Sequence, residues 1–145
     1  MKKILILLSS LHHAVYISLI FLAWIPQIGL SQEIQNLDSL ELSYRAEKYE
    51  ESHRLMILQQ LAREHEDNNK KILYSTELID ISVEMDSIDK QFDGYIARGH
   101  AQITKGEYSD ALEDYFEASK IASQSGDEDQ EAIVNLAIAG GYSRL

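Results

Sequence analysis

The sequence predicts an all-α protein built as an antiparallel helix-hairpin solenoid of about 2.5 repeats. Three observations predict this fold class. Apolar residues recur three and four positions apart, a spacing typical of one-sided helices. The pattern of helices and turns returns at a fixed interval, so that the stretch 88–105 is matched by the stretch 127–145. After Pro26 the chain holds neither Pro nor Trp, and Gly is absent between Leu30 and Gly94, so nothing interrupts long helices there.

The N-terminal segment, residues 1–31, has the layout of a signal peptide. Lys2 and Lys3 open the chain, an apolar run covers residues 14–25, and Gly29 and Ser31 stand at the −3 and −1 positions of a cut before Gln32. A positive start, an apolar middle and a small-residue exit are the three parts of such a leader. We therefore predict residues 1–31 to be a signal peptide, cleaved between Ser31 and Gln32, and the protein to be exported to the periplasm or cell envelope.

An uncleaved anchor is the alternative for the same segment. The apolar stretch 14–30 is slightly shorter than a membrane-spanning helix, which needs about 20 residues. The protein would then be anchored in the inner membrane, and we expect membrane contact only in that case. The chain contains no cysteine, which excludes a lipid-modified N-terminal Cys and a disulfide framework.

The charge of the chain argues against nucleic acid as a partner. It carries 24 acidic and 13 basic residues, a formal net charge of −11. A nucleic-acid binder needs a basic surface that displaces counterions, and this chain has the opposite sign. The simplest role of the acidic surface is to keep a helical protein soluble.

The helical part is expected to begin after an acidic lead-in over residues 32–47, in which a short helix starts at Asp38. Five helices follow, at about 48–65, 69–85, 88–105, 108–124 and 127–145. Turn residues separate them, and Gly106 is suited to a left-handed helix end. We assign residues 48–145 to one repeat domain. It comprises a degenerate repeat (48–85), a clear repeat (88–125) and a truncated half repeat (127–145).

A shift by 40 positions superposes these helices on one another. The helix at 88–105 then lies on that at 127–145, and the helix at 69–85 lies on that at 108–124. Gly99 meets Ala139, and Asp89 meets Asp129. A fixed period of helix and turn is typical of a solenoid, in which each hairpin buries its apolar face on the next.

One stretch resembles a known family, the tetratricopeptide repeat (TPR). The residues that carry the resemblance are Tyr95, Gly99, Gly106, Tyr108, Ala111, Tyr115 and Ala118. The resemblance implies a TPR-like superhelix in which small residues let two helices approach and Tyr rings fill the gaps. The chain departs from the family at Arg98, where Leu is usual, at Ser123, where Pro is usual, and in its period of 40 instead of 34.

The resemblance also implies where a partner binds. In the family, a concave face is lined by the first helix of each repeat. The matching positions here are Asp93, His100, Thr104, Gly140 and Arg144. We expect the partner to be a protein or a peptide.

No residue pattern indicates catalysis, a cofactor or a metal. His65-Glu66 resembles the start of a zinc-protease helix, but Asn69 occupies the position of the second His. The acidic runs near residues 86–93 and 127–131 lack the alternating ligands and central Gly of a calcium loop. No Gly-rich phosphate loop or nucleophile elbow is present. We therefore expect no catalytic, cofactor-binding or metal-binding residues in this chain.

These observations predict an interaction module, and they leave alternatives. The 125–127 linker resembles those found before effector domains in bacterial signal-transduction proteins, so we expect the sensory or docking part of such a protein. One alternative is an enzyme or regulator whose effector domain, a nucleotide cyclase, a histidine kinase or a DNA-binding domain, lies beyond Leu145. Another is a freestanding structural adaptor. The half repeat leaves Leu136, Ala139 and Tyr142 without a covering helix, so we also expect self-association through this C-terminal end.

Overall fold

The computed structural model describes residues 28–145, with side chains described from Leu37 onward. The chain divides into two compact units, with the boundary between Asp38 and Ser39. No helix in the described range is both long and apolar enough to cross a membrane. The apolar part of the predicted leader lies outside the described residues, and the predicted cleavage point at Ser31 and Gln32 lies within the first described helix. Cleavage and export stay predictions.

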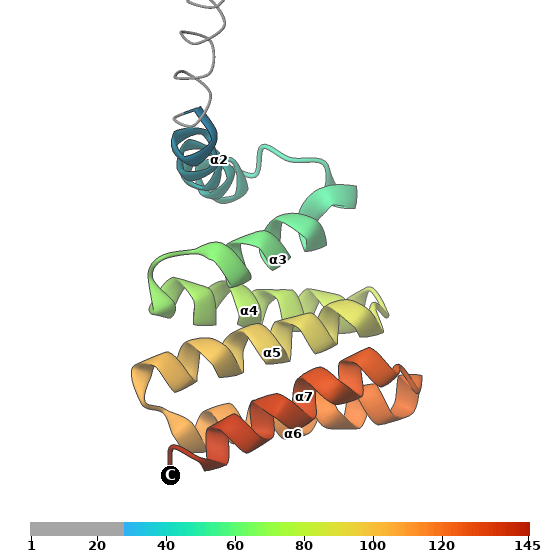
Figure 1. Cartoon of the computed structure of the whole chain (residues 1–145). Helices are drawn as coiled ribbons and strands as arrows, with labels where there is room; N and C mark the ends of the chain where they lie inside the picture. Colours follow the sequence, from blue (N-terminus) through green and yellow to red (C-terminus); the bar gives the residue numbers. More distant parts are fainter. Residues whose placement is uncertain (1–27) are drawn as a thin grey trace, which may run out of the picture. The chain divides into compact units, whose positions relative to one another are not determined.

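The described part of the chain is all-α, as the sequence predicted. It comprises α2 (Ile28–Arg45), α3 (Arg54–Glu64), α4 (Asn68–Glu84), α5 (Ile88–Lys105), α6 (Tyr108–Ser125) and α7 (Glu128–Tyr142), with a short 3-10 helix η1 (Glu51–His53) before α3. No strand occurs among residues 28–145. From α3 onward each helix packs on the next, and successive helices run in opposite directions (Figure 1).

The helix starts repeat with the predicted period. α4 begins at Asn68 and α6 at Tyr108, while α5 begins at Ile88 and α7 at Glu128, so the two starts of each pair lie 40 positions apart. The ends of α4 and α6 match as well, because Asp86 (φ 53°) and Gly126 (φ 68°) both take the left-handed conformation. α5 also contacts α3 and α7, the helices two places before and after it.

The N-terminal boundaries differ from those predicted. The first described helix begins at Ile28, not at Asp38, and residues from Ser39 onward belong to the same compact unit as α3 to α7. The helix expected at 48–65 is shorter, because Glu47 has a positive φ of 54° and Glu50 is extended. Because of this break the regular helix is confined to α3, and α3 is shorter than α5, the first helix of the following hairpin.

Acidic side chains begin two of the helices. The Asp67 carboxylate accepts a hydrogen bond from the Asn69 backbone N–H at 2.8 Å, and the Asp127 carboxylate accepts from those of Asp129 and Gln130 at 2.9 and 3.1 Å. Such caps satisfy backbone donors that the first turn of a helix leaves free. They set the starts of α4 and α7.

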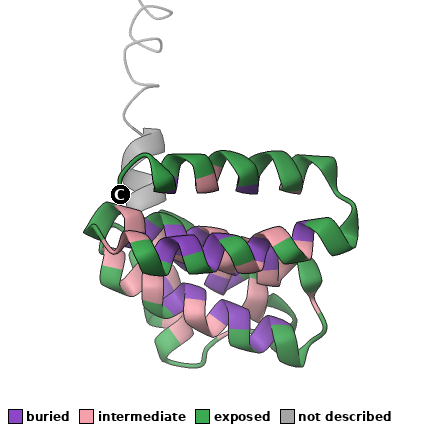
Figure 2. Cartoon of the chain, turned by 90° about the horizontal axis from the view of Figure 1, so that it is seen from below, coloured by how far each residue is buried: buried purple, intermediate pink, exposed green. Residues whose placement is uncertain are grey.

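Small residues bring α5, α6 and α7 close together. Ala111, Tyr115 and Ala118 are fully buried in the core between α5, α6 and α7. In Figure 2, which is coloured by burial, the buried residues gather where the helices meet. Gly99 lies against the Tyr115 ring, and Gly141 of α7 lies against Leu112. Glycine and alanine therefore make room in the core for the larger side chains of Tyr115 and Leu112.

α7 has one packed face and one open face. Val134 and Gly141 are buried against α6, whereas Ala132, Leu136 and Ala139, which the repeat pattern places on the opposite stripe, are exposed. Leu136 is 76 % exposed, the largest value among the exposed large apolar side chains of the described range.

Two helical glycines give the first testable prediction. A Cβ at Gly99 would collide with the buried Tyr115 ring, whereas a Cβ at Gly140 would meet no atom within 4 Å. We expect Gly99→Ala to lower the free energy of unfolding by about 1 to 3 kcal/mol through overpacking. Gly140→Ala should raise it by roughly 0.5 to 1 kcal/mol, because Ala is the better helix former. Denaturant unfolding of dilute samples measures both, and changes of the same sign would contradict this packing.

Candidate functional site

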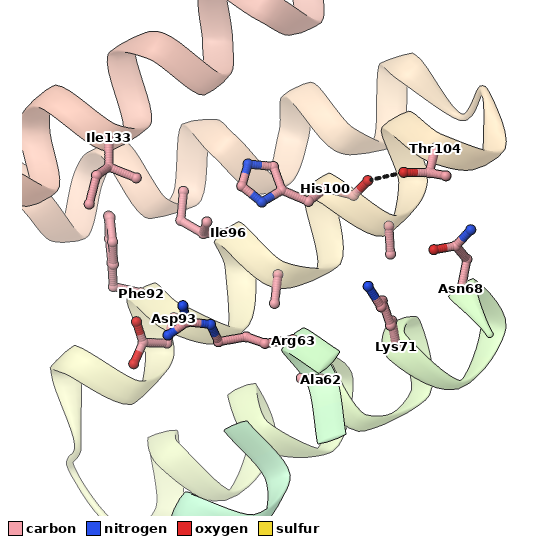
Figure 3. Close-up of a pocket in the computed structure, with 12 residues that line it drawn as sticks. Ala62, Arg63, Asn68, Lys71, Phe92, Asp93, Ile96, His100, Thr104 and Ile133 are labelled. Atoms are coloured by element: carbon pink, nitrogen blue, oxygen red, sulfur yellow. Dashed lines mark hydrogen bonds between the residues drawn. The ribbon is translucent and has the colours of Figure 1, made fainter. Parts of the chain in front are cut away.

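The faces of α3, α5 and α7 that lie on one side of the hairpins enclose a cavity of about 370 Å³. Its apolar wall is formed mainly by Phe92, Ile96 and Ala97 of α5, with Ala62 of α3 and Ile133 of α7 at its sides. The start of α4 contributes polar side chains (Figure 3). We call this space the groove cavity. It is open at the surface and therefore accessible to a chain segment of a partner.

Two cations lie in the groove cavity without a partner in the described part of the chain. Arg63 of α3 and Lys71 of α4 line the cavity, and neither has a carboxylate within 4 Å among residues 37–145 (Figure 3). The nearby Asp93 carboxylate is already engaged, because it accepts a hydrogen bond from Gln59 at 2.5 Å and faces Lys90 at 3.4 Å. The cavity thus offers positive charge in a protein that is acidic as a whole.

His100 adds a neutral polar group to the same wall. Its ring lies edge-on to the Tyr115 ring, with the centroids 5.7 Å apart. Although His100 is exposed at the cavity surface, partial desolvation by the surrounding helices lowers its pKa, and the positive charge of Lys71 lowers it further. The imidazole is therefore uncharged at neutral pH and can act as a hydrogen-bond donor and acceptor.

A second cavity of about 330 Å³ adjoins the first along α7. The two cavities share His100 and Ile133. The second cavity is otherwise lined by residues of α7, by Arg144 just after it, and by Ile103 of α5 and Tyr115 of α6. The five residues predicted to bind a partner lie along these two cavities. Asp93, His100 and Thr104 line the groove cavity, and Gly140 and Arg144 line the second one. Their role in binding stays a prediction.

Sequence reasoning missed Arg63 and Lys71. Forty positions later stand Ile103 on α5 and Ala111 on α6, and both pack inward. A charged residue whose counterpart 40 positions later is apolar was the signal that could have identified Arg63 and Lys71.

Arg98, the residue that departs from the resembled family, forms a buried ion pair. Its guanidinium donates to both carboxylate oxygens of Asp114, at 2.8 and 2.7 Å, and to the hydroxyl of Thr76 at 3.1 Å. It also lies over the Tyr95 ring, 5.5 Å from the centroid. Because α4, α5 and α6 all contribute, this pair holds the two hairpins together rather than facing a ligand.

Glu41 is the centre of a second buried polar cluster. Tyr74 donates a hydrogen bond to its carboxylate at 2.7 Å, Lys70 Nζ lies 2.8 Å from it, and a ring nitrogen of His65 lies 3.2 Å from it. Burial raises the pKa of Glu41, but the hydrogen bonds from Lys70, Tyr74 and His65 outweigh this effect and lower it to about 2. The cluster attaches the last turns of α2 to α3 and α4.

In the described part of the chain, no group of three or more His, Asp or Glu side chains is arranged to hold a metal ion. Comparison with protein-family models, with curated proteins and with solved structures found no match for this chain.

Proposed function

We propose that residues 54–145 form a helical-repeat scaffold of the TPR type, whose groove cavity binds a segment of a partner protein. The 40-residue spacing of helix starts and the contacts of α5 with both α3 and α7 support the repeat assignment. In such an arrangement the first helices of successive hairpins form one continuous surface, on which a chain segment can lie across several repeats. Export and a role in signalling are further proposals, which rest on the sequence alone.

The charge of the groove cavity defines the chemistry of the proposed partner. The single observation that carries this proposal is the pair of cations, Arg63 and Lys71, left without carboxylates in a chain that has an excess of acids. Cations that the protein does not neutralise internally are available to a ligand. We infer a peptide segment with at least one carboxylate and with apolar side chains that pack on Phe92 and Ile96.

Selection of phage-displayed random peptides on the immobilised protein tests this function. We expect the selected peptides to be enriched in Asp, Glu and apolar residues. The double variant Arg63→Glu/Lys71→Glu should weaken their binding by roughly tenfold or more, because two attractions become repulsions worth about 1.4 kcal/mol or more together. Fluorescence anisotropy of labelled peptides measures the change.

A matched control separates the groove cavity from the net charge of the protein. Lys48→Glu/Lys120→Glu changes the charge by the same amount at exposed positions outside both cavities. Binding of the selected peptides should be almost unchanged in this variant. Equal losses in the two double variants, or selected peptides without acidic residues, would contradict the proposed site.

A further inference from the structure

His100 is the side chain through which the charge of the groove cavity can respond to pH. Among the described residues that line this cavity, it is the only one of a type that ordinarily gains a charge between about pH 5 and pH 8. It lines the adjoining cavity as well, and it is exposed, so the imidazole is accessible from both spaces (Figure 3). Lys and Arg side chains, in contrast, are cations over this whole range.

The charged side chains that other helices bring to the cavities around His100 are cations. Arg63 of α3 and Lys71 of α4 line the groove cavity, and Arg144, just after α7, lines the adjoining one. From α6 comes the Tyr115 ring, which is an uncharged phenol because burial raises its pKa to about 12. Desolvation and the charge of Lys71 both oppose protonation, so the pKa of His100 lies below its ordinary value in the free protein.

No acid in the described part of the chain compensates for these cations. Asp93 of α5 is the one acid among the described residues that line the two cavities, and it is engaged by Gln59 at 2.5 Å and by Lys90 at 3.4 Å. Among residues 37–145, no carboxylate lies within 4 Å of a ring nitrogen of His100. Within this part of the molecule, a protonated His100 therefore has no counter-ion, and a bound ligand could supply one.

We propose that binding of an acidic peptide segment in the groove cavity is coupled to protonation of His100, so that the affinity increases as the pH falls. This inference rests on the proposed function of the groove cavity. A ligand carboxylate near the imidazole favours its charged form, so the pKa of His100 is higher in the complex than in the free protein. Between these two pKa values the complex holds a proton that the free protein lacks. Linkage then requires the affinity to rise as the pH falls through this range and to level off below it.

Fluorescence anisotropy with the full chain at about pH 7.5 and about pH 5.5 tests the coupling. The probe is a rhodamine-labelled peptide from the phage selection that contains Asp or Glu but no His. Its carboxylates stay ionised at both pH values, because their ordinary pKa values are about 4. We expect the peptide to bind roughly threefold to tenfold more tightly at the lower pH, because a pKa difference of about one unit corresponds to at most a tenfold change in affinity.

Two variants identify the group that titrates. His100→Gln keeps a polar side chain without a charge change, and the affinity of this variant should differ by less than about twofold between the two pH values. His53→Gln removes a histidine at an exposed position outside both cavities, and it should retain the full pH effect. An affinity of the native chain that is equal at both pH values, or a pH effect that persists in His100→Gln, would overturn the coupling and leave the proposed peptide site intact.

The proposed function fails by a different result. Absence of peptide binding at both pH values, or binding that the Arg63→Glu/Lys71→Glu variant does not weaken, would contradict the groove cavity as the site and the coupling with it. NMR signals of the His100 ring give a readout that does not depend on affinity. A pH titration should show a pKa higher by about one unit or more with saturating peptide than without it. A His100 titration that the bound peptide leaves unchanged, or moves to lower pH, would overturn the coupling.

Discussion

Replacing Asp114 by Leu is expected to lower the free energy of unfolding by about 3 to 5 kcal/mol. The Asp114 carboxylate is 5 % exposed and accepts both of its hydrogen bonds from Arg98. Its removal leaves the guanidinium, which is mostly buried, without a counter-ion. An uncompensated charge in such a place is far more costly than the loss of an exposed pair, whose contribution is about 0 to 1 kcal/mol.

The double variant Arg98→Leu/Asp114→Leu distinguishes an unpaired charge from lost packing. Removing both charges should restore most of the stability, because a buried pair replaced by apolar side chains of similar size is often neutral. Glu113→Ala, next to Asp114 but exposed, should change stability by less than about 0.5 kcal/mol. Denaturant unfolding of the four variants measures the coupling between Arg98 and Asp114. Additive effects of the two single replacements would show that the pair is not coupled as described.

Replacing Glu41 by Gln is expected to lower the free energy of unfolding by about 3 kcal/mol at neutral pH. The pKa of Glu41 lies near 2 in the folded protein and at 4.5 in the reference state, and each unit of difference corresponds to about 1.4 kcal/mol. Because the folded pKa is the lower one, this stability is present above about pH 4.5. It is lost as the pH falls toward 2, where the carboxylate becomes protonated in the folded protein too.

The pH dependence is the measurement that identifies this carboxylate. The difference in unfolding free energy between the native chain and Glu41→Gln should be largest near pH 7, shrink below pH 4.5 and vanish near pH 2. Glu50→Gln, at an exposed position, should differ little from the native chain at any pH. A difference for Glu41→Gln that stays constant from pH 7 to pH 2 would exclude the ionised cluster as its cause.

The predicted helix boundaries agree with the structure best where the signals are local. The turn at Gly106 takes the left-handed conformation expected of it, with φ 82°, and α5 spans the residues predicted for the third helix. The first helix was predicted too long. Its residues have a helical pattern, but the positive φ of Glu47 and the extended Glu50 interrupt it, and neither residue type signals such a break.

The candidate site was only partly accessible to sequence reasoning. The resemblance placed Asp93, His100 and Thr104 on the first helix of a repeat, and the structure shows all three lining the groove cavity. It did not indicate Arg63 or Lys71. Arg63 lies at the end of α3, directly after the buried Leu61 and Ala62, and Lys71 lies on α4, the second helix of its hairpin, whereas the resemblance assigns partner binding to first helices. Both side chains reach the cavity because of the way α3, α4 and α5 pack against one another, which the sequence does not reveal.

The sequence by itself determined the helical class, the 40-residue spacing of helix starts and the ends of α4, α5 and α6 to within one residue, because helix periodicity and capping act between residues about four positions apart. The tertiary structure decided the pairing of Arg98 with Asp114, 16 residues away, and of Glu41 with His65, Lys70 and Tyr74, 24 to 33 residues away. It also decided which face of α7 packs on α6. Such contacts depend on how whole helices pack against one another. Many charged residues lie on helix surfaces at similar spacings, so no local sequence pattern identifies which two of them the fold brings together.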